Sequence, residues 1–294
     1  MTGNQMDKAK GPAAEAAPFT PLSQVRAQLG ESPVWSIAYQ AIWWVDIIGQ
    51  KLFCTTLDGA TREWSTPGLP GFVQIREAEV LVGLPTGIYC FDPVTELFEQ
   101  RAACTMPGLR FNDACSDGLG RIWAGTMDID NQNANGTLFL YDPAHQRLEP
   151  MADGFRTING LAWDSARRRL YFSDSHPSSQ TVWTSAVLPD GQLSERVVFA
   201  RFDALDGRPD GAALDADGCY WIAGVGGGTL YRFSPDGALR SCFRVPVQSP
   251  TKPAIVGRHG NAMVLTSFDD GHIGGRLALW TTPPIAPLQE RSAT

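Results

Sequence analysis

A hairpin pattern that recurs six times constrains the fold of this chain more than any other feature of its sequence. In each copy a short apolar strand is followed by a second one, and Gly, Pro, Asn and Asp cluster between the copies. The first strands of the six hairpins are residues 43–46, 80–83, 121–125, 170–174, 219–224 and 262–266. Equivalent positions recur at intervals averaging about 44 residues, which matches the period of roughly 40–50 residues of four-stranded propeller blades.

Six blades of this size use the chain from about residue 20 onward, so we predict an all-β fold, a single six-bladed β-propeller over residues 21–290. Residues 1–20 have no apolar run and are expected to form a disordered N-terminal tail. A β-sandwich with regular turns is the alternative, and the six matched hairpins favour the propeller over it. With 294 residues, 43% of them hydrophobic, the chain can bury a core without disulfides or a structural metal.

Charge and hydropathy argue against two classes of partner. The chain carries 24 Lys and Arg against 31 Asp and Glu, and its net charge of −7 would repel a nucleic-acid backbone. No apolar stretch approaches the roughly 20 residues that span a bilayer, and the N-terminus lacks the hydrophobic segment of a secretory signal. We therefore expect a cytoplasmic protein with no nucleic-acid or membrane partner, and its six cysteines, which have no C-x-x-C spacing, are expected to be reduced thiols.

Four short polar motifs precede apolar strands at the blade entrances. They are Gly-Glu-Ser-Pro at 30–33, Arg-Phe-Asn-Asp at 110–113, Ile-Asn-Gly-Leu at 158–161 and Arg-Pro-Asp-Gly at 208–211. Each motif alone is typical of a tight turn, because Asn-Gly and Asp-Gly are common turn dipeptides. Their recurrence in phase with the blades indicates more, since equivalent loops of a propeller converge on one mouth of the central channel. We therefore predict a functional site at that mouth.

These motifs, together with Gly-Arg-Ile-Trp-Ala-Gly-Thr-Met at 120–127, resemble the SMP-30/gluconolactonase/LRE-like family of sugar lactonases over about residues 22–285. The resemblance implies a six-bladed propeller with one divalent metal in its central channel. It implies that the metal ligands are Glu31, Asn159 and Asp210. The residues around Thr251-Lys252-Pro253 are similar to the bacterial sugar-acid lactonases of this family.

The same resemblance implies a set of substrate contacts. Arg110 and Asn112 are expected to bind the substrate, and an acidic residue three positions beyond the methionine of the Ala-Gly-Thr-Met strand is expected to contact sugar hydroxyls. That residue is Asp130, and Asp128 is the alternative. His176 follows the fourth blade's strand and is a further residue that could reach the mouth.

The residue types of this set support the same chemistry. Two carboxylates and an amide oxygen suit Ca²⁺, Mg²⁺ or Mn²⁺ and tolerate Zn²⁺ or Fe²⁺. Three protein ligands leave positions open for a lactone carbonyl or a water, and a cation both polarises a carbonyl and lowers the pKa of a bound water. Either that water or Asp210 is then the effective base, and Arg110 would stabilise the oxyanion.

The sequence therefore predicts a metal-dependent lactonase that hydrolyses an aldonolactone to the aldonic acid in carbohydrate catabolism. Its substrate would be a pentono- or hexonolactone such as arabinono-, xylono- or gluconolactone. Two alternatives stay open at this point: a phosphotriesterase-like hydrolase, which Glu31 and Asp210 would serve equally well, and a non-catalytic calcium-binding regulatory propeller. The polar set Arg110, Asn112 and Asp130 favours a polyhydroxylated substrate.

Overall fold

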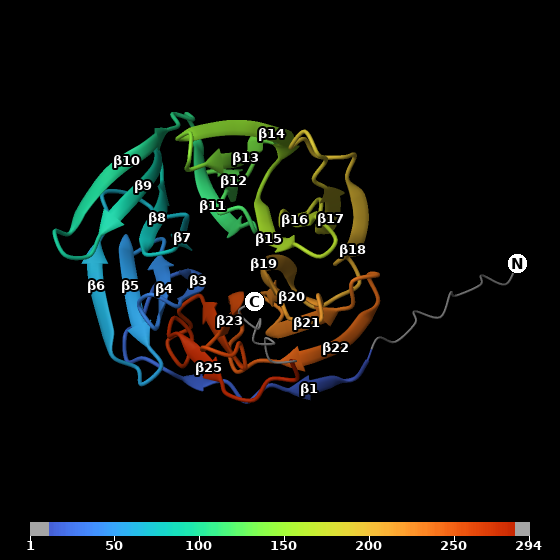
Figure 1. The fold of residues 1–294 in the computed structure, drawn as a ribbon. Helices are drawn as coiled ribbons and strands as arrows, with labels where there is room; N and C mark the ends of the chain where they lie inside the picture. The colour runs from blue at the N-terminus through green and yellow to red at the C-terminus, as the bar shows by residue number, and fades with distance from the viewer. Residues whose placement is uncertain (1–11, 286–294) are drawn as a thin grey trace, which may run out of the picture.

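Six sheets are arranged around a common axis in the computed structural model, which describes residues 12–285 (Figure 1). Five sheets contain four antiparallel strands, and the remaining sheet has four antiparallel strands and one added parallel strand, so the predicted all-β, six-bladed propeller is confirmed. The innermost strands of the blades are β3 (Gly30–Ser36), β7 (Phe72–Arg76), β11 (Leu109–Ser116), β15 (Ile158–Asp164), β19 (Arg208–Leu214) and β23 (Pro250–Val256). In the described part of the chain, no helix has the length and hydrophobicity that a membrane crossing requires.

The six hairpins recognised in the sequence are the second and third strands of the blades. The second strands are β4 (Ala41–Asp46), β8 (Glu79–Leu84), β12 (Ile122–Asp128), β16 (Arg169–Asp174), β20 (Tyr220–Val225) and β24 (Ala262–Ser267). The third strands are β5 (Lys51–Thr56), β9 (Gly87–Asp92), β13 (Gly136–Asp142), β17 (Thr181–Ala186), β21 (Thr229–Phe233) and β25 (Ala278–Trp280). The outer strands of the first five blades are β6 (Thr61–Ser65), β10 (Leu97–Ala103), β14 (Arg147–Phe155), β18 (Val197–Arg201) and β22 (Leu239–Arg244).

The hydrophobic core is divided into six clusters, one at each interface between neighbouring blades. Between the first and second blades, for example, Trp43 packs with Val73 and Phe91. The last cluster joins the sixth blade to the first, where Val264 and Trp44 are both fully buried. Because every blade buries both of its faces against neighbours, the apolar side chains close a complete ring and leave polar side chains to line the axis.

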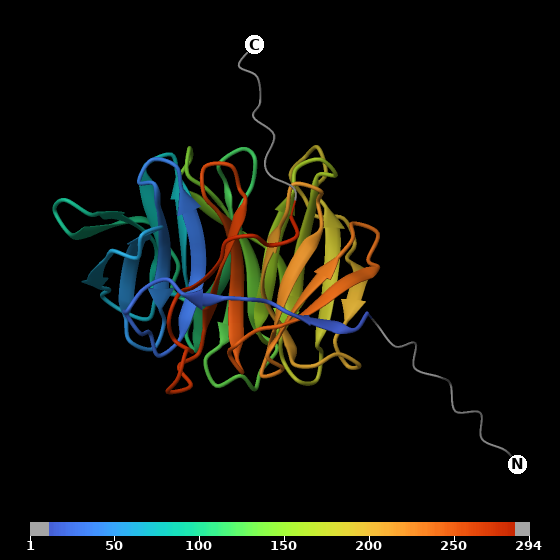
Figure 2. The same cartoon turned by 90° about the horizontal axis from the view of Figure 1, so that it is seen from below.

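The N-terminal segment strengthens this closure. β2 (Thr20–Pro21) pairs with β25 as the fourth strand of the sixth blade, and β1 (Ala14–Ala16) runs parallel to β22 on the fifth blade. Figure 2 shows this segment, in blue, crossing the outside of both blades. The prediction of a disordered tail over residues 1–20 is therefore wrong for its second half, because strands of two and three residues are too short to show an alternating pattern. Residues 1–11 of that predicted tail lie outside the described residues, as do residues 286–290 of the predicted domain.

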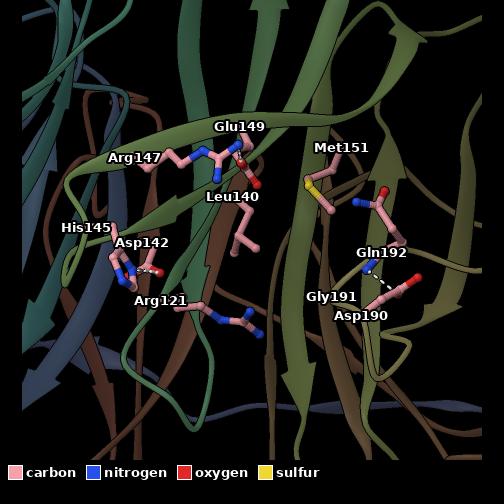
Figure 3. A pocket seen from close by; sticks show the side chains of 10 residues that line it. All are labelled: Arg121, Leu140, Asp142, His145, Arg147, Glu149, Met151, Asp190, Gly191 and Gln192. Atoms are coloured by element: carbon pink, nitrogen blue, oxygen red, sulfur yellow. Dashed lines mark hydrogen bonds and ion pairs between the residues drawn. The ribbon is translucent and has the colours of Figure 1, made fainter.

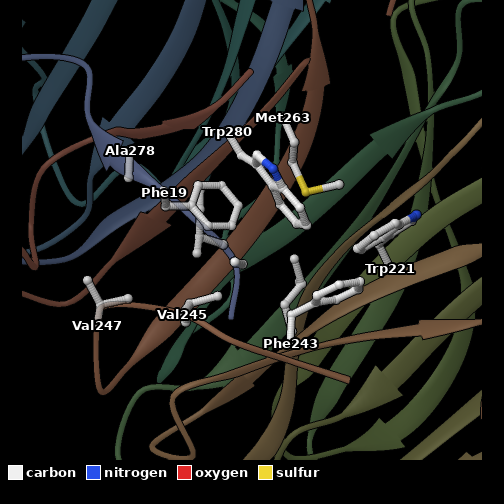
Figure 4. Packing of buried hydrophobic residues seen from close by; sticks show 11 residues of the cluster. Phe19, Trp221, Phe243, Val245, Val247, Met263, Ala278 and Trp280 are labelled. Carbon is white, nitrogen blue, oxygen red and sulfur yellow. The ribbon is translucent and has the colours of Figure 1, made fainter. Parts of the chain in front are cut away.

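Phe19 anchors the N-terminal segment to the core. Its side chain is 4% exposed and meets Trp280 edge to face, with ring centroids 5.5 Å apart (Figure 4). We expect Phe19→Leu to lower the free energy of unfolding by about 1 kcal/mol, because the smaller side chain loses the aromatic contact. Urea denaturation measures this change, with Leu97→Ala at an exposed position as the control. An unchanged unfolding midpoint for Phe19→Leu would show that the segment does not contribute to closing the ring.

Candidate functional site

Interruptions of regular pairing direct polar side chains toward the channel. The pairing of β3 with β4 shifts register between Glu31 and Val34, and β15 and β19 shift in the same way between Asn159 and Ala162 and between Pro209 and Ala212. Such bulges re-aim side chains. The four motifs thus lie mainly within the innermost strands, and the expectation that they form turns ahead of the strands is wrong: their Gly and Pro residues accommodate bulges.

A pocket of about 150 Å³ opens at one end of the channel, and its walls have two layers. Four residues of the inner strands form the deeper layer and are buried: Glu31, Asn112, Asn159 and Asp210. The residues two positions earlier on the same segments form the outer layer: Leu29, Arg110, Thr157 and Arg208. Later residues of the same inner strands line another pocket at the opposite end of the channel. The layer of Glu31, Asn112, Asn159 and Asp210 is therefore the one nearer the channel interior.

The deeper layer contains an oxygen that lacks a partner. The amide of Asn159 donates a hydrogen bond from Nδ2 to Oδ1 of Asp210, while its own Oδ1 is buried without any hydrogen bond. A buried carbonyl oxygen without a partner is costly and calls for a bound group. With the carboxylates of Glu31 and Asp210 beside it, this oxygen fits a divalent cation that prefers oxygen ligands. Among residues 12–285 no three His, Cys, Asp or Glu side chains are grouped to hold an ion, so this site would need the amide as its third ligand.

Burial governs the ionisation of the two carboxyl groups. Burial, and then repulsion from Asp113, raises the pKa of Asp210 to about 8. Burial and the nearby Asp210 likewise raise the pKa of Glu31 well above its ordinary value. Arg110 faces both groups, and burial lowers the pKa of its guanidinium to about 10 although both carboxylates oppose this shift. In the free pocket burial therefore favours the protonated carboxyl groups, and a cation that binds them would have to displace those protons.

These pKa shifts predict how cation binding depends on pH. Metal-free Asp210 keeps a proton at pH 7 because its folded pKa is about 8, whereas the cation binds the carboxylate form. We expect calorimetry in buffers of different ionisation enthalpy to show the release of roughly one proton or more per ion near pH 6–7, and of fewer protons above about pH 9, where Asp210 is already ionised. Proton release that does not change between these pH values would contradict the assignment of these ligands.

The stability of the metal-free protein should follow the same groups. From about pH 4 to pH 8 the unfolded chain has lost the Asp210 proton while the folded chain retains it, so the unfolding free energy decreases as the pH rises. Chelator-treated protein should therefore unfold at lower urea concentration at pH 8 than at pH 5. Added cation should largely remove this trend at the alkaline end.

A buried ion pair, Lys252 with Asp113, lies close to the carboxyl groups of the pocket. Lys252 Nζ donates hydrogen bonds to Oδ1 of Asp113 and, at 3.0 Å, to the carbonyl oxygen of Ala114. The other carboxylate oxygen of Asp113 accepts a hydrogen bond from the backbone N–H of Leu161 at 2.8 Å. The stem of Lys252 crosses Gly211, where an added Cβ would collide with the lysine side chain. Lys252 thus places one positive charge close enough to Glu31 and Asp210 to lower the pKa of both.

Five of the six site residues predicted from the sequence meet in this pocket: Glu31, Arg110, Asn112, Asn159 and Asp210. Asp130 does not, because it is exposed and lies outside the pocket lining. The alternative, Asp128, is turned into its own loop, where it accepts hydrogen bonds from the backbone N–H groups of Gln132 at 2.6 Å and Asn133 at 2.9 Å. His176 is also absent from the lining, and its ring accepts a hydrogen bond from the N–H of Ser178 within its own turn.

Several pocket residues had no role assigned from the sequence, among them Asn131 and Arg208. Asn131 lines the pocket in the place expected for Asp130, and its φ of 53° together with a hydrogen bond from Thr157 fixes its amide. Arg208 opens the Arg-Pro-Asp-Gly motif and also faces the pocket. The signal for Arg208 was its position two residues before Asp210, which matches the spacing of Arg110 to Asn112.

A different pocket, of about 420 Å³, lies on the outside of the molecule, next to the third blade (Figure 3). Its charged side chains pair with one another: His145 with Asp142 at 2.7 Å, and Arg147 with Glu149. None of the predicted site residues lines it. The channel pocket is therefore the better candidate for chemistry.

Comparisons with known proteins identify the family of this chain. Residues 29–269 match the family model described as SMP-30/Gluconolactonase/LRE-like region. The chain is 35% identical to a 6-deoxy-6-sulfogluconolactonase from Pseudomonas putida, over 86% of this chain and 87% of the relative. It is 31% identical to an L-arabinolactonase from Azospirillum brasilense, over 88% and 91% of the two chains. The solved structure of a calcium-binding protein, regucalcin, from Agrobacterium tumefaciens has a TM-score of 0.83 and 22% identity, covering 94% and 99% of the two chains, which supports the fold alone.

Proposed function

Because this chain belongs to the SMP-30/gluconolactonase/LRE-like family, we propose that it is a metal-dependent lactonase that hydrolyses a five- or six-carbon aldonolactone to the aldonic acid. The protein is a hydrolase that acts on the ester bond of lactones. Its relatives act on a hexonolactone derivative and on a pentonolactone, which supports this substrate range. Its cytoplasmic location and its lack of nucleic-acid and membrane partners stay predictions from the sequence.

One observation carries the metal assignment. The buried Oδ1 of Asn159 has no hydrogen-bond partner and lies in the same layer as the carboxylates of Glu31 and Asp210. We assign these three residues as the ligands of one divalent cation, either Ca²⁺, Zn²⁺, Mn²⁺, Mg²⁺ or Fe²⁺. When bound, the cation would polarise the lactone carbonyl as a Lewis acid.

The side chains around the cation site supply the remaining functions. Asn159 holds Oδ1 of Asp210, so Oδ2 is the oxygen free to accept the proton of the attacking water. The water oxygen bonds to the carbonyl carbon, the ring C–O bond breaks, and the proton passes to the former ring oxygen, which leaves as a hydroxyl. Arg110 faces the same space and would stabilise the oxyanion that develops during attack.

Substrate hydroxyls would meet the remaining amides. Asn112 donates from Nδ2 to the carbonyl oxygen of Ile158 at 3.0 Å, which leaves its Oδ1 as an acceptor for a sugar hydroxyl. Thr157 donates to Oδ1 of Asn131, so the Nδ2 of Asn131 is left as a donor at the rim. We propose Asn131, in place of Asp130, as the contact to the sugar hydroxyls on this side.

Lactone hydrolysis by chelator-stripped protein tests this function. A panel of pentono- and hexonolactones, followed by proton release, should show turnover only after one of the five cations is restored. Glu31→Gln should lose that restored turnover because it removes one ligand charge. A folded protein that hydrolyses none of these lactones with any cation would overturn the proposal, and phosphotriesters would then be the next substrates to test.

A further inference from the structure

The outer layer of the pocket holds a cation, the guanidinium of Arg208, that is not paired directly with any side chain in residues 12–285. Arg208 is half-buried and lines the pocket, yet among the described residues its guanidinium makes no hydrogen bond and no ion pair within 4.0 Å. Two other arginines of this blade are engaged: Arg232 pairs with Asp215 at 2.7 Å, and Arg244 pairs with Asp206 at 2.7 Å. The charge nearest to Arg208 in sequence is Asp210, which its field stabilises in the ionised form.

The charge balance of the loaded pocket leaves Arg208 without a counterpart. A divalent cation offsets the charges of Glu31 and Asp210, and the Lys252–Asp113 pair offsets itself. Two positive charges, those of Arg110 and Arg208, then face the bound substrate. The oxyanion formed at the lactone carbonyl offsets one of them, so a substrate that is neutral elsewhere leaves the other unmatched.

The position of Arg208 indicates where a second negative charge of the substrate would lie. Two residues along an extended strand span roughly 7 Å, so the Cα atom of Arg208 lies at most about that far from the Cα atom of Asp210, on the side of the outer layer. With the lactone carbonyl near the cation, this distance is comparable to the reach of the far end of a six-carbon lactone. A guanidinium presents a rigid fork of donors that matches the oxygens of a carboxylate, sulfonate or phosphate.

We propose that the substrate is an aldonolactone with an oxyanion group at the end of the sugar chain, and that Arg208 is the residue that selects it. This inference rests on the proposed lactonase function and narrows its substrate class. Arg110 then serves the carbonyl end of the substrate and Arg208 the tail. Thr157 and Ser175 also line the pocket.

The test compares lactones that differ only at the sixth carbon. Wild-type protein with restored cation is given gluconolactone and counterparts that carry a carboxylate, a phosphate or a sulfonate at that carbon, which separates the three sources of an oxyanion. We expect at least one charged lactone to exceed gluconolactone in kcat/KM by about 10-fold or more, and this preference should weaken as salt is raised.

Variants at Arg208 then show whether this residue causes the preference for charged lactones. Arg208→Gln should lower the ratio of kcat/KM for the charged lactone over gluconolactone by about 10- to 100-fold, and Arg208→Lys should restore part of it. Arg201→Gln removes the same charge at an exposed strand end and should leave the ratio unchanged. Calorimetry on chelator-treated protein gives a readout without turnover: the charged product acid should bind the wild type more tightly than Arg208→Gln.

The outcomes separate this inference from the proposed function. A wild type that hydrolyses gluconolactone as well as every charged counterpart would overturn the inference and leave the lactonase assignment standing. Equal losses for all lactones in Arg208→Gln would show that Arg208 acts through Asp210 instead of on the tail. Absence of turnover on all of them would overturn the lactonase function itself, and the inference with it.

Discussion

Asp210→Asn should lower kcat/KM for lactone hydrolysis by about 10²- to 10⁴-fold, the range expected when a positioned base is lost. The substitution keeps the shape of the side chain and removes its charge, so the protein should fold while cation affinity and proton transfer both decline. Asp210 is 6% exposed and accepts a hydrogen bond from Asn159. Glu31 is the one other carboxyl side chain among the residues that line this pocket.

The matched control for this prediction is Asp153→Asn. Asp153 is an exposed aspartate on the outer strand β14, far from the pocket in the order of the blade, and its loss should leave turnover within about 2-fold. Steady-state kinetics at saturating cation separates weaker ion binding from a slower chemical step. Near-normal turnover by Asp210→Asn with the cation still bound would show that the roles given to Asp210 are wrong.

Lys252→Met should destabilise the fold by about 3–5 kcal/mol, the cost expected when one partner of a buried ion pair is removed. The side chain of Asp113 is completely buried, and without Lys252 its charge has no cation within hydrogen-bonding distance. Methionine preserves the stem that crosses Gly211, so the change tests the charge more than the packing.

A second variant makes this prediction specific to the ion pair. In Lys252→Met with Asp113→Asn neither buried charge is left, so the double variant should be more stable than Lys252→Met alone. Urea unfolding of the four proteins gives the coupling between the two side chains. Additive losses would mean that the pair contributes no more than its separate contacts.

Lys252 should also influence the ionisation of the site residues Glu31 and Asp210. Its field lowers the pKa values of Glu31 and Asp210, although burial keeps both raised. Without it both carboxyl groups should hold their protons more tightly. The ion pair thus affects both the stability of the inner strands and the ionisation of Glu31 and Asp210.

The fold could be predicted from the sequence because its strongest pattern is repeated six times. Strands such as β4 and β20 are apolar on both faces, since neighbouring blades cover both, and their runs stand out against the turns between them. The closure of the ring could not be predicted in this way. β1 and β2 pair with strands at the other end of the chain, and no local pattern signals a partner so distant.

The candidate site could be predicted in part for a related reason. Glu31, Asn159 and Asp210 occupy equivalent places at the start of inner strands, so a regular fold brings them together. Asp130 was misplaced because its position depends on one loop, whose course is set by the hydrogen bonds of Asp128 and the left-handed backbone of Asn131. The Lys252–Asp113 pair joins residues 139 apart, and only the ring geometry makes them neighbours.

A titration that follows bound cation and lactone turnover in the same samples tests the central claim most directly. Chelator-stripped protein is given increasing cation, and equilibrium dialysis and proton release are measured at each step. The account predicts that turnover rises in proportion to bound ion and levels off at about one ion per chain, and that Glu31→Gln shows neither. Full turnover by protein that holds no ion, or one ion bound in the pocket of Glu31, Asn159 and Asp210 without turnover on any lactone, would contradict it.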